Sequence, residues 1–294
     1  MTAPYLEHRI PSSDGIMLYA RDYGGDAPGA QERLPVVCLA GLTRNSRDFH
    51  PLAVILSSDT LSPRRVITID TRGRGESSWD SDHARYTVLH EAGDVLAVLV
   101  ALGISRAAFI GTSRGGLILH ILAALQPQLL GAVILNDVGP AIGLEGLRHI
   151  QSYLAQRPAY ASLGAAAASL KLVHGPAFPR LTDADWMEFA QATLKETDGR
   201  YEPDHDPAIA EATAALDLNQ PLPELWDQFD LFRANPLMTI RGENSVLLTP
   251  EILVRMQDRN PHMAVLLVAD QGHAPLLHLE GTPAVIGTFL NRAA

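Results

Sequence analysis

The chain alternates short, continuously apolar runs with segments in which apolar residues recur every three or four positions. The apolar runs cover residues 34–40, 66–69, 107–110, 132–135, 236–240 and 263–268. Each is typical of a strand buried on both faces, and the segment 89–102 is typical of the amphipathic helices between such strands. Together with two strand-like runs at 7–10 and 16–23, this alternation predicts an α/β fold with a mostly parallel, doubly wound sheet.

The alternation stops between residues 141 and 230. Helical patterns in this stretch cover Leu144–Ala155, Tyr160–Leu172, Asp183–Lys195 and about Ile209–Ala215. No convincing strand is found here, and proline-containing linkers separate the helical patterns. We therefore predict a core domain in two parts, residues 1–140 and 231–294, with residues 141–230 inserted as an all-helical cap, or lid, over the active site.

A candidate nucleophile lies between an apolar run and a helical pattern, in the sequence Gly111-Thr112-Ser113-Arg114-Gly115. A strand, a G-x-S-x-G turn and a helix form a nucleophile elbow. The two glycines lack the Cβ atoms that would clash in so sharp a turn, which lets Ser113 take a strained conformation. Its hydroxyl is then exposed at the sheet edge. The backbone N–H of Arg114, at the helix N-terminus, is a candidate oxyanion donor.

A serine nucleophile needs a general base and an acid that orients the base. His273 is the candidate base, because it follows the last predicted strand. The triad residues that accompany such an elbow occur along the chain in the order serine, acid, histidine, and His273 fits the last place. The acid should therefore follow a strand between Ser113 and His273. Asp137 and Glu243 both meet this condition. The residues alone leave both carboxylates open as the triad acid.

The loop after the run at 34–40 is expected to supply the second oxyanion donor, the N–H of Leu42, with Gly41 giving room beside it. Gly41 and Arg44, in the same loop, and Trp186 of the predicted cap are candidates for substrate contacts. The side chain of Arg114 is expected to pair with a structural acid, for instance in the loop that begins at Asp70. Candidates for the apolar wall of a pocket come from the predicted cap: Tyr153, Tyr160, Phe178, Trp186, Met187 and Phe189.

These motifs resemble the α/β-hydrolase superfamily over nearly the whole chain. The matching segments are Ala40–Leu42, Asp70–Ser77, Gly111–Gly116, Leu135–Pro140, Arg241–Ser245 and Gly272–His273. Relatives with the Arg-Gly-Glu-x-Ser motif usually carry the triad aspartate directly after its serine, where this chain has Val246. Some branches place the acid after the strand that follows the elbow, which is the position of Asp137. The resemblance therefore favours Asp137 as the acid, with Glu243 second.

The resemblance implies a serine hydrolase that cleaves a small-molecule ester or lactone through an acyl-enzyme on Ser113, with His273 as base. Serine at the elbow argues against haloalkane dehalogenases and epoxide hydrolases, which use aspartate there. Two alternatives are a cofactor-free dioxygenase of N-heteroaromatic substrates that uses a His–Asp dyad, and a catalytically silent receptor for a small ligand. We expect no cofactor and no metal ion.

Composition and charge narrow the expected partners. A net charge of −10 without a cluster of Lys and Arg argues against nucleic acid as a partner. The single cysteine, Cys38, lies in an apolar run and is expected to be a buried thiol. The chain has no apolar stretch long enough for a bilayer, and its first residues lack a signal-peptide pattern. We expect a cytoplasmic protein that acts on a small-molecule substrate and binds no membrane; a homodimer is left open.

Overall fold

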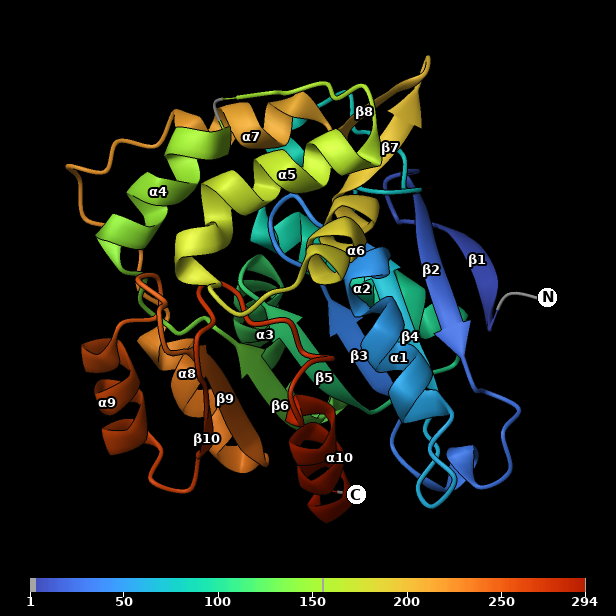
Figure 1. Ribbon diagram of the computed structural model, residues 1–294. Coiled ribbons are helices and arrows are strands. Elements are labelled where there is room, and N and C mark those ends of the chain that lie inside the picture. The colour runs from blue at the N-terminus through green and yellow to red at the C-terminus, as the bar shows by residue number, and fades with distance from the viewer. Residues whose placement is uncertain (1–3, 155, 294) are drawn as a thin grey trace.

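One eight-stranded sheet forms the centre of the protein, described in a computed structural model for residues 4–154 and 156–293. Its strands are β1 (Tyr5–Pro11), β2 (Met17–Tyr23), β3 (Val36–Leu39), β4 (Val66–Asp70), β5 (Ala107–Thr112), β6 (Leu130–Asn136), β9 (Leu237–Gly242) and β10 (Ala264–Val268). The strand order is β1-β2-β4-β3-β5-β6-β9-β10 (Figure 1). Neighbours from β4 to β10 are parallel, whereas β1 and β2 join antiparallel at one edge. This arrangement confirms the predicted fold class.

Helices cover both faces of the sheet. They are α1 (His50–Ser57), α2 (Val88–Ala101), α3 (Arg114–Leu125), α8 (Trp226–Leu231), α9 (Pro250–Arg259) and α10 (Thr282–Arg292). Along β3, Val37 and Leu39 pack with α2, α3, α8 and α9, whereas Val36 and Cys38 pack with α1 and α10. Successive side chains of a strand point to opposite faces, so a continuously apolar run is required where both faces are covered. Cys38 is a buried free thiol, as predicted.

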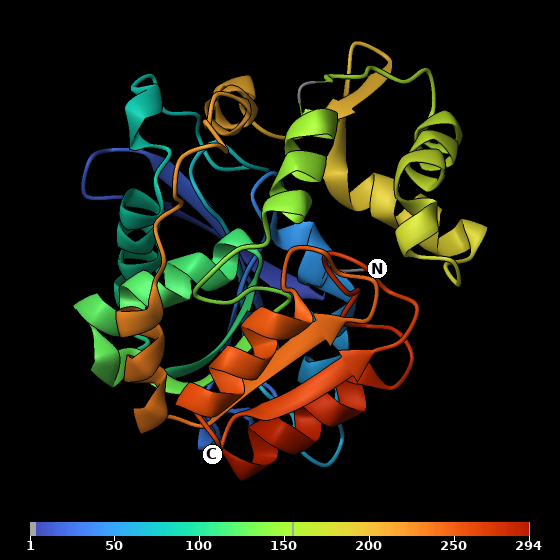
Figure 2. The same ribbon diagram turned by 90° about the vertical axis from the view of Figure 1, so that its left-hand side faces the viewer.

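The segment between β6 and α8 lies above the sheet in both ribbon views (Figures 1 and 2). It contains α4 (Leu144–Leu154), α5 (Leu163–His174), α6 (Asp183–Thr193), α7 (Pro207–Ala214) and a hairpin of β7 (Leu194–Thr197) and β8 (Arg200–Pro203). The four predicted helices are present, although the predicted end of the first, Ala155, lies outside the described residues. α8 starts before residue 230, where the predicted cap ends, yet its Phe229 packs in the cluster with α2 and α3.

The hairpin in this segment was not expected from the sequence, which indicated helices only. Its turn is Asp198-Gly199, with φ angles of 50° and 73°. An Asp-Gly pair is a strong signal for a two-residue hairpin turn, because both positions need positive φ. The helical periodicity of the preceding residues was instead extended to Lys195, two residues past the end of α6. The inserted segment is therefore mainly helical, with one short two-stranded sheet.

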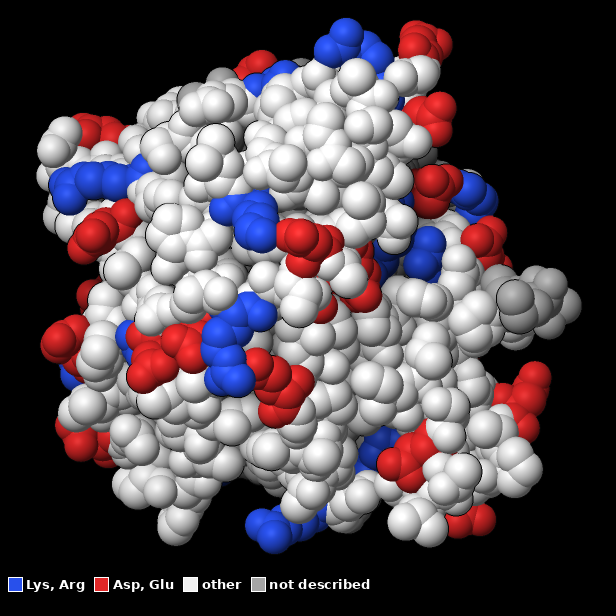
Figure 3. All heavy atoms as spheres, viewed as in Figure 1, with Lys and Arg blue, Asp and Glu red and all other residues white. Residues whose placement is uncertain are grey.

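Within residues 4–154 and 156–293, no helix combines the length and the apolar character needed to cross a bilayer. On the face shown in Figure 3, Lys and Arg side chains are scattered among Asp and Glu rather than gathered in one patch.

Candidate active site

The serine turn at the end of β5 has the strained geometry of a nucleophile elbow. Ser113 has φ 51° and ψ −115°, a conformation that non-glycine residues rarely adopt, and it directly precedes α3. A Cβ at Gly111 would lie 2.6 Å from the backbone nitrogen of Gly116. A Cβ at Gly115 would overlap the carbonyl of Leu39 in the neighbouring strand β3. Close approach of α3 to the sheet therefore requires both glycines, and it projects Ser113 from the sheet edge.

This crowding gives a stability prediction with a matched control. Gly115→Ala is expected to lower the free energy of unfolding by about 1–3 kcal/mol, because the added methyl meets backbone rather than a movable side chain. Gly93→Ala, in the exposed part of α2 with open space around the new methyl, is expected to raise it by about 0.5–1 kcal/mol. Thermal and urea unfolding of both variants measures the two shifts. Equal shifts for the two variants would contradict the packing argument.

Ser113, His273 and Asp137 lie in one hydrogen-bonded chain. Nε2 of His273 is 2.9 Å from Oγ of Ser113, and Nδ1 of His273 is 2.7 Å from Oδ2 of Asp137. The carboxylate on Nδ1 assigns the proton to that nitrogen, which leaves Nε2 to accept the serine proton. The three residues follow β5, β10 and β6, so the carboxyl ends of the parallel strands bring them together.

Asp137 is fully buried and is held by two further donors. The backbone N–H of Gly242 donates to Oδ1 at 2.9 Å, and the hydroxyl of Ser245 donates to Oδ2. Asp137 also has a positive φ of 56°, which directs its side chain toward β9. Ser245 therefore belongs to the site as a hydrogen-bond donor to the acid, a role that the sequence pattern around it did not indicate. Val246, the next residue, is 40% exposed.

Glu243 does not reach the histidine. Its Oε2 accepts a hydrogen bond from the backbone N–H of Asp270 at 3.1 Å, and the side chain is exposed. β6 and β9 are parallel neighbours in the sheet, so Asp137 and Glu243, which directly follow them, lie at the same edge of the sheet. Their side chains nevertheless point to different surroundings, and only Asp137 contacts His273.

The two loops expected to supply oxyanion donors flank the serine. A Cβ at Gly41 would be 3.8 Å from the Cβ of Ser113, an ordinary van der Waals contact, so this loop lies directly beside the elbow. Within the described residues, the backbone N–H groups of Leu42 and Arg114 donate no hydrogen bond. The side chain of Arg114 turns away and pairs with Glu91 on α2 at 2.6 Å, not with an acid from the loop after Asp70. Sequence patterns did not single out Glu91.

A cavity of about 590 Å³ lies between this site and the inserted segment. Gly41, Leu42, Ser113 and His273 line one side, and residues of α4, α5, α6 and α7 line the other. The size is in the range of pockets that enclose a small molecule. Among the aromatic residues proposed for its wall, those that do line it are Tyr153, Tyr160, Phe178 and Phe189.

Arg44 and Trp186 were both candidates for substrate contacts, and their positions differ. Arg44 lines the cavity, forms an ion pair with Asp48 at 2.6 Å and lies 4.0 Å from the ring centroid of Phe189. Trp186 is 2% exposed and is not among the described residues that line the cavity. It fills the small core of the inserted segment, with its ring 6.3 Å from Phe178 and 5.8 Å from Phe189. Trp186 thus supports the wall from behind.

Two histidines of the inserted segment also line the cavity and were not singled out in the sequence. Burial, together with the nearby charges of Arg44 and Arg157, lowers the pKa of His174 and of His205 to about 4. Both imidazoles are therefore neutral at neutral pH. The two imidazoles therefore offer uncharged hydrogen-bonding groups to a bound molecule, beside Arg157 and Glu211, which line the same side of the cavity.

Comparison with known proteins places the chain in a family. A family model described as alpha/beta hydrolase fold matches residues 35–278, and the chain belongs to this family of hydrolases. It is 33% identical over 252 residues to the 3-hydroxybutyrate-oligomer hydrolase of Cupriavidus necator, with 82% of each chain covered. It is 25% identical over 269 residues to esterase Rv0045c of Mycobacterium tuberculosis, covering 86% of this chain and 78% of the relative.

A solved structure supports the same assignment. The chain superposes on the crystal structure of an alpha/beta hydrolase from Novosphingobium aromaticivorans with a TM-score of 0.90 and 35% sequence identity. The match covers 99% of this chain and 100% of the other. The sequence-based resemblance to the α/β-hydrolase superfamily is thereby confirmed.

Proposed function

We propose that the protein is a serine hydrolase that cleaves the carboxylic ester bond of a small molecule, either an open-chain ester or a lactone. The observation that carries this proposal is the hydrogen-bonded chain from Asp137 through His273 to Ser113 at the edge of the cavity beneath the inserted segment. An activated nucleophile, its base and an orienting acid are the parts that acyl transfer requires.

The proposed reaction proceeds through an acyl-enzyme. Oγ of Ser113 attacks the carbonyl carbon while Nε2 of His273 takes its proton, and the carbonyl electron pair moves to oxygen. The N–H groups of Leu42 and Arg114 stabilise this oxyanion, and Asp137 stabilises the imidazolium. Collapse of the intermediate breaks the ester C–O bond, and His273 gives its proton to the leaving alkoxide. His273 then deprotonates a water that attacks the acyl-enzyme, and it returns this proton to Oγ of Ser113 as the bond from Oγ to the acyl carbon breaks and the acid is released.

A short linear oligoester of a hydroxy acid is the first substrate class to test. The relative from Cupriavidus necator is named for 3-hydroxybutyrate oligomers and shares 33% identity over 82% of both chains. A cavity of about 590 Å³ has room for a molecule of a few such units. Hydrolysis of an internal ester would split the oligomer into two shorter molecules, one with a new carboxylate end and the other with a new hydroxyl end.

The experiment is fluorophosphonate labelling of the purified protein, together with a substrate panel. The panel contains p-nitrophenyl esters, lactones of several ring sizes and a dimer and trimer of 3-hydroxybutyrate, followed by product analysis. We expect stoichiometric labelling and turnover of at least one ester class. A folded protein that is neither labelled nor active on any ester contradicts the proposal.

The receptor and the cofactor-free dioxygenase can each be distinguished from an ester hydrolase with the same purified protein. A receptor without catalytic function was expected to have no carboxylate within reach of His273, and Asp137 lies within that reach. A cofactor-free dioxygenase would consume oxygen with a quinolone substrate, and this uptake would persist in Ser113→Ala. An oxygen electrode measurement on wild type and variant separates that chemistry from ester hydrolysis.

A further inference from the structure

Glu91 of α2 is a buried carboxylate shared by two arginines. Its Oε1 accepts from Nη1 of Arg74 at 2.7 Å and from Nη2 of Arg114 at 3.0 Å, and its Oε2 accepts from Nε of Arg114 at 2.6 Å. The side chains of Glu91 and Arg74 are fully buried. Burial alone would raise the pKa of Glu91, but the charges of Arg74 and Arg114 hold this pKa below its ordinary value. One ionised carboxylate therefore joins the two guanidinium groups.

Arg74 carries this connection to the loop after β3. Its Nε donates to the backbone carbonyl of Leu42 at 2.9 Å, while its Nη1 also donates to the carbonyl of Arg72 at 2.7 Å. A fully buried guanidinium fixed at Glu91 and at Arg72 has little freedom to move. The carbonyl of Leu42 is consequently held in place, and with it the backbone of a residue whose N–H is one of the two proposed oxyanion donors.

Arg114 carries the connection to the elbow. It is the first residue of α3, and its own backbone N–H is the other proposed oxyanion donor. Its side chain donates two parallel hydrogen bonds to the carboxylate of Glu91. A third, from Nη2, goes to the carbonyl of Tyr86 at 2.9 Å. Two-pronged contacts of this kind fix orientation as well as distance. The first turn of α3 is thereby anchored to α2.

We propose that Glu91 is a positioning residue, which through Arg74 and Arg114 holds the N–H groups of Leu42 and Arg114 in the relative orientation that a tetrahedral oxyanion requires. This inference rests on the proposed function. None of the three charged side chains is among the described residues that line the cavity, so they act through the backbone rather than on substrate. Fixed donors stabilise a developing charge without reorganising at the moment of reaction, so small displacements are costly.

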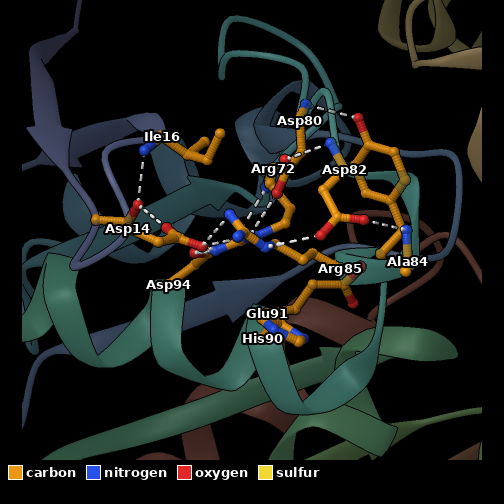
Figure 4. A network of polar contacts seen from close by, with 12 residues as sticks. Asp14, Ile16, Arg72, Asp80, Asp82, Ala84, Arg85, His90, Glu91 and Asp94 are labelled. Carbon is orange, nitrogen blue, oxygen red and sulfur yellow. Dashed lines mark hydrogen bonds and ion pairs between the residues drawn. The ribbon is translucent and has the colours of Figure 1, made fainter.

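Asp94 offers a matched control on the same helix (Figure 4). It lies three residues after Glu91, its side chain is also fully buried, and it pairs with the buried guanidinium of Arg72 at 2.6 Å. The other carboxylates on Arg72 are Asp14 and Asp80, and neither bonds to Leu42 or Arg114. Removing the charge of Asp94 therefore disrupts a comparable buried ion pair without directly releasing either proposed donor.

The test compares Glu91→Gln with Asp94→Asn at a temperature at which circular dichroism shows both variants folded. Both are expected to unfold at lower temperature than wild type. For a good ester substrate, Glu91→Gln is expected to lower kcat by about 10- to 100-fold with little change in KM. Deleting one oxyanion donor lowers kcat by about 10²- to 10³-fold, and displacing a donor should lower it by less. Asp94→Asn is expected to keep kcat within about threefold of wild type.

A transition-state readout separates positioning from a general loss of structure. A boronic acid that forms a tetrahedral adduct with Ser113 should bind Glu91→Gln more weakly by the same factor as the loss in kcat. Arg74→Lys provides a second variant, because it keeps the charge beside Glu91 while a single ammonium cannot reproduce the guanidinium contacts to Glu91, Leu42 and Arg72. Arg74→Lys is expected to lower kcat in the same way. If Glu91→Gln does not fold, Arg74→Lys replaces it in the comparison with Asp94→Asn.

Hydrogen–deuterium exchange gives a readout that does not depend on activity. Peptides covering residues 39–45 and 113–117 are expected to exchange faster in Glu91→Gln than in Asp94→Asn. If wild type is neither labelled nor active, the proposed function fails, and faster exchange in these peptides still supports the positioning role. If wild type is active and Glu91→Gln matches Asp94→Asn in kcat, inhibitor affinity and exchange, the positioning role is overturned while the proposed function stands.

Discussion

Ser113→Ala is expected to lower kcat for ester hydrolysis by a factor on the order of 10⁶ and to abolish fluorophosphonate labelling, because the nucleophile and base act as a unit. Without the serine oxygen, His273 has no group to deprotonate at 2.9 Å and no acyl-enzyme forms. The fold should persist, since the strain at φ 51° is borne by the backbone and the hydroxyl contributes no cap to α3. Burst kinetics with a p-nitrophenyl ester and intact-protein mass spectrometry measure both effects.

Ser58→Ala is the matched control for this variant. Ser58 is exposed at the end of α1, where the only partner of its hydroxyl among the described residues is the carbonyl of Val54. It is expected to retain full labelling and activity. A Ser113→Ala protein that is still labelled, or that keeps activity within tenfold of wild type, would show that another residue is the nucleophile.

Asp137→Asn is expected to lower kcat by a factor on the order of 10⁴ with a small change in KM, by analogy with loss of the acid in other triads. The amide removes the negative charge that stabilises the imidazolium. Its NH₂ group can also donate to Nδ1 of His273, which moves the ring proton to Nε2 and leaves no acceptor for the serine hydroxyl. Steady-state kinetics and a circular dichroism spectrum of the variant check the effect on rate and fold.

Glu243→Gln is the comparison that decides the identity of the acid. Glu243 is exposed, and an amide oxygen can still accept from the N–H of Asp270, so kcat is expected to change by less than about threefold. A large loss in Glu243→Gln together with an active Asp137→Asn would overturn the assignment of Asp137.

The order of strands and helices could be predicted from the sequence because it depends on local periodicity. A strand buried on both faces needs a continuous apolar run, and α2 begins within one residue of the expected segment 89–102. The inserted hairpin was missed where two local signals compete, a helical pattern running to Lys195 and the turn at Asp198. Such a competition is decided by packing in the inserted segment, which the local pattern does not contain.

The choice between the two acids could not be made from the residues alone. Asp137 and Glu243 follow neighbouring strands, and chain order and spacing are satisfied by both. The decision comes from the loop conformation, because the positive φ of Asp137 directs its carboxylate to the N–H of Gly242, the hydroxyl of Ser245 and His273. The resemblance to a superfamily favoured the same residue.

The sequence by itself determined the α/β architecture, the turn that presents Ser113 and the loop that carries His273, since glycine spacing and hydrophobic period act over a few residues. Only the tertiary structure decided which carboxylate contacts His273, that Trp186 lies behind the cavity wall and that Glu91 joins Arg74 to Arg114. Each of these depends on side chains from different elements meeting in space. Their directions are set by packing and by hydrogen bonds across the fold, which no local pattern encodes.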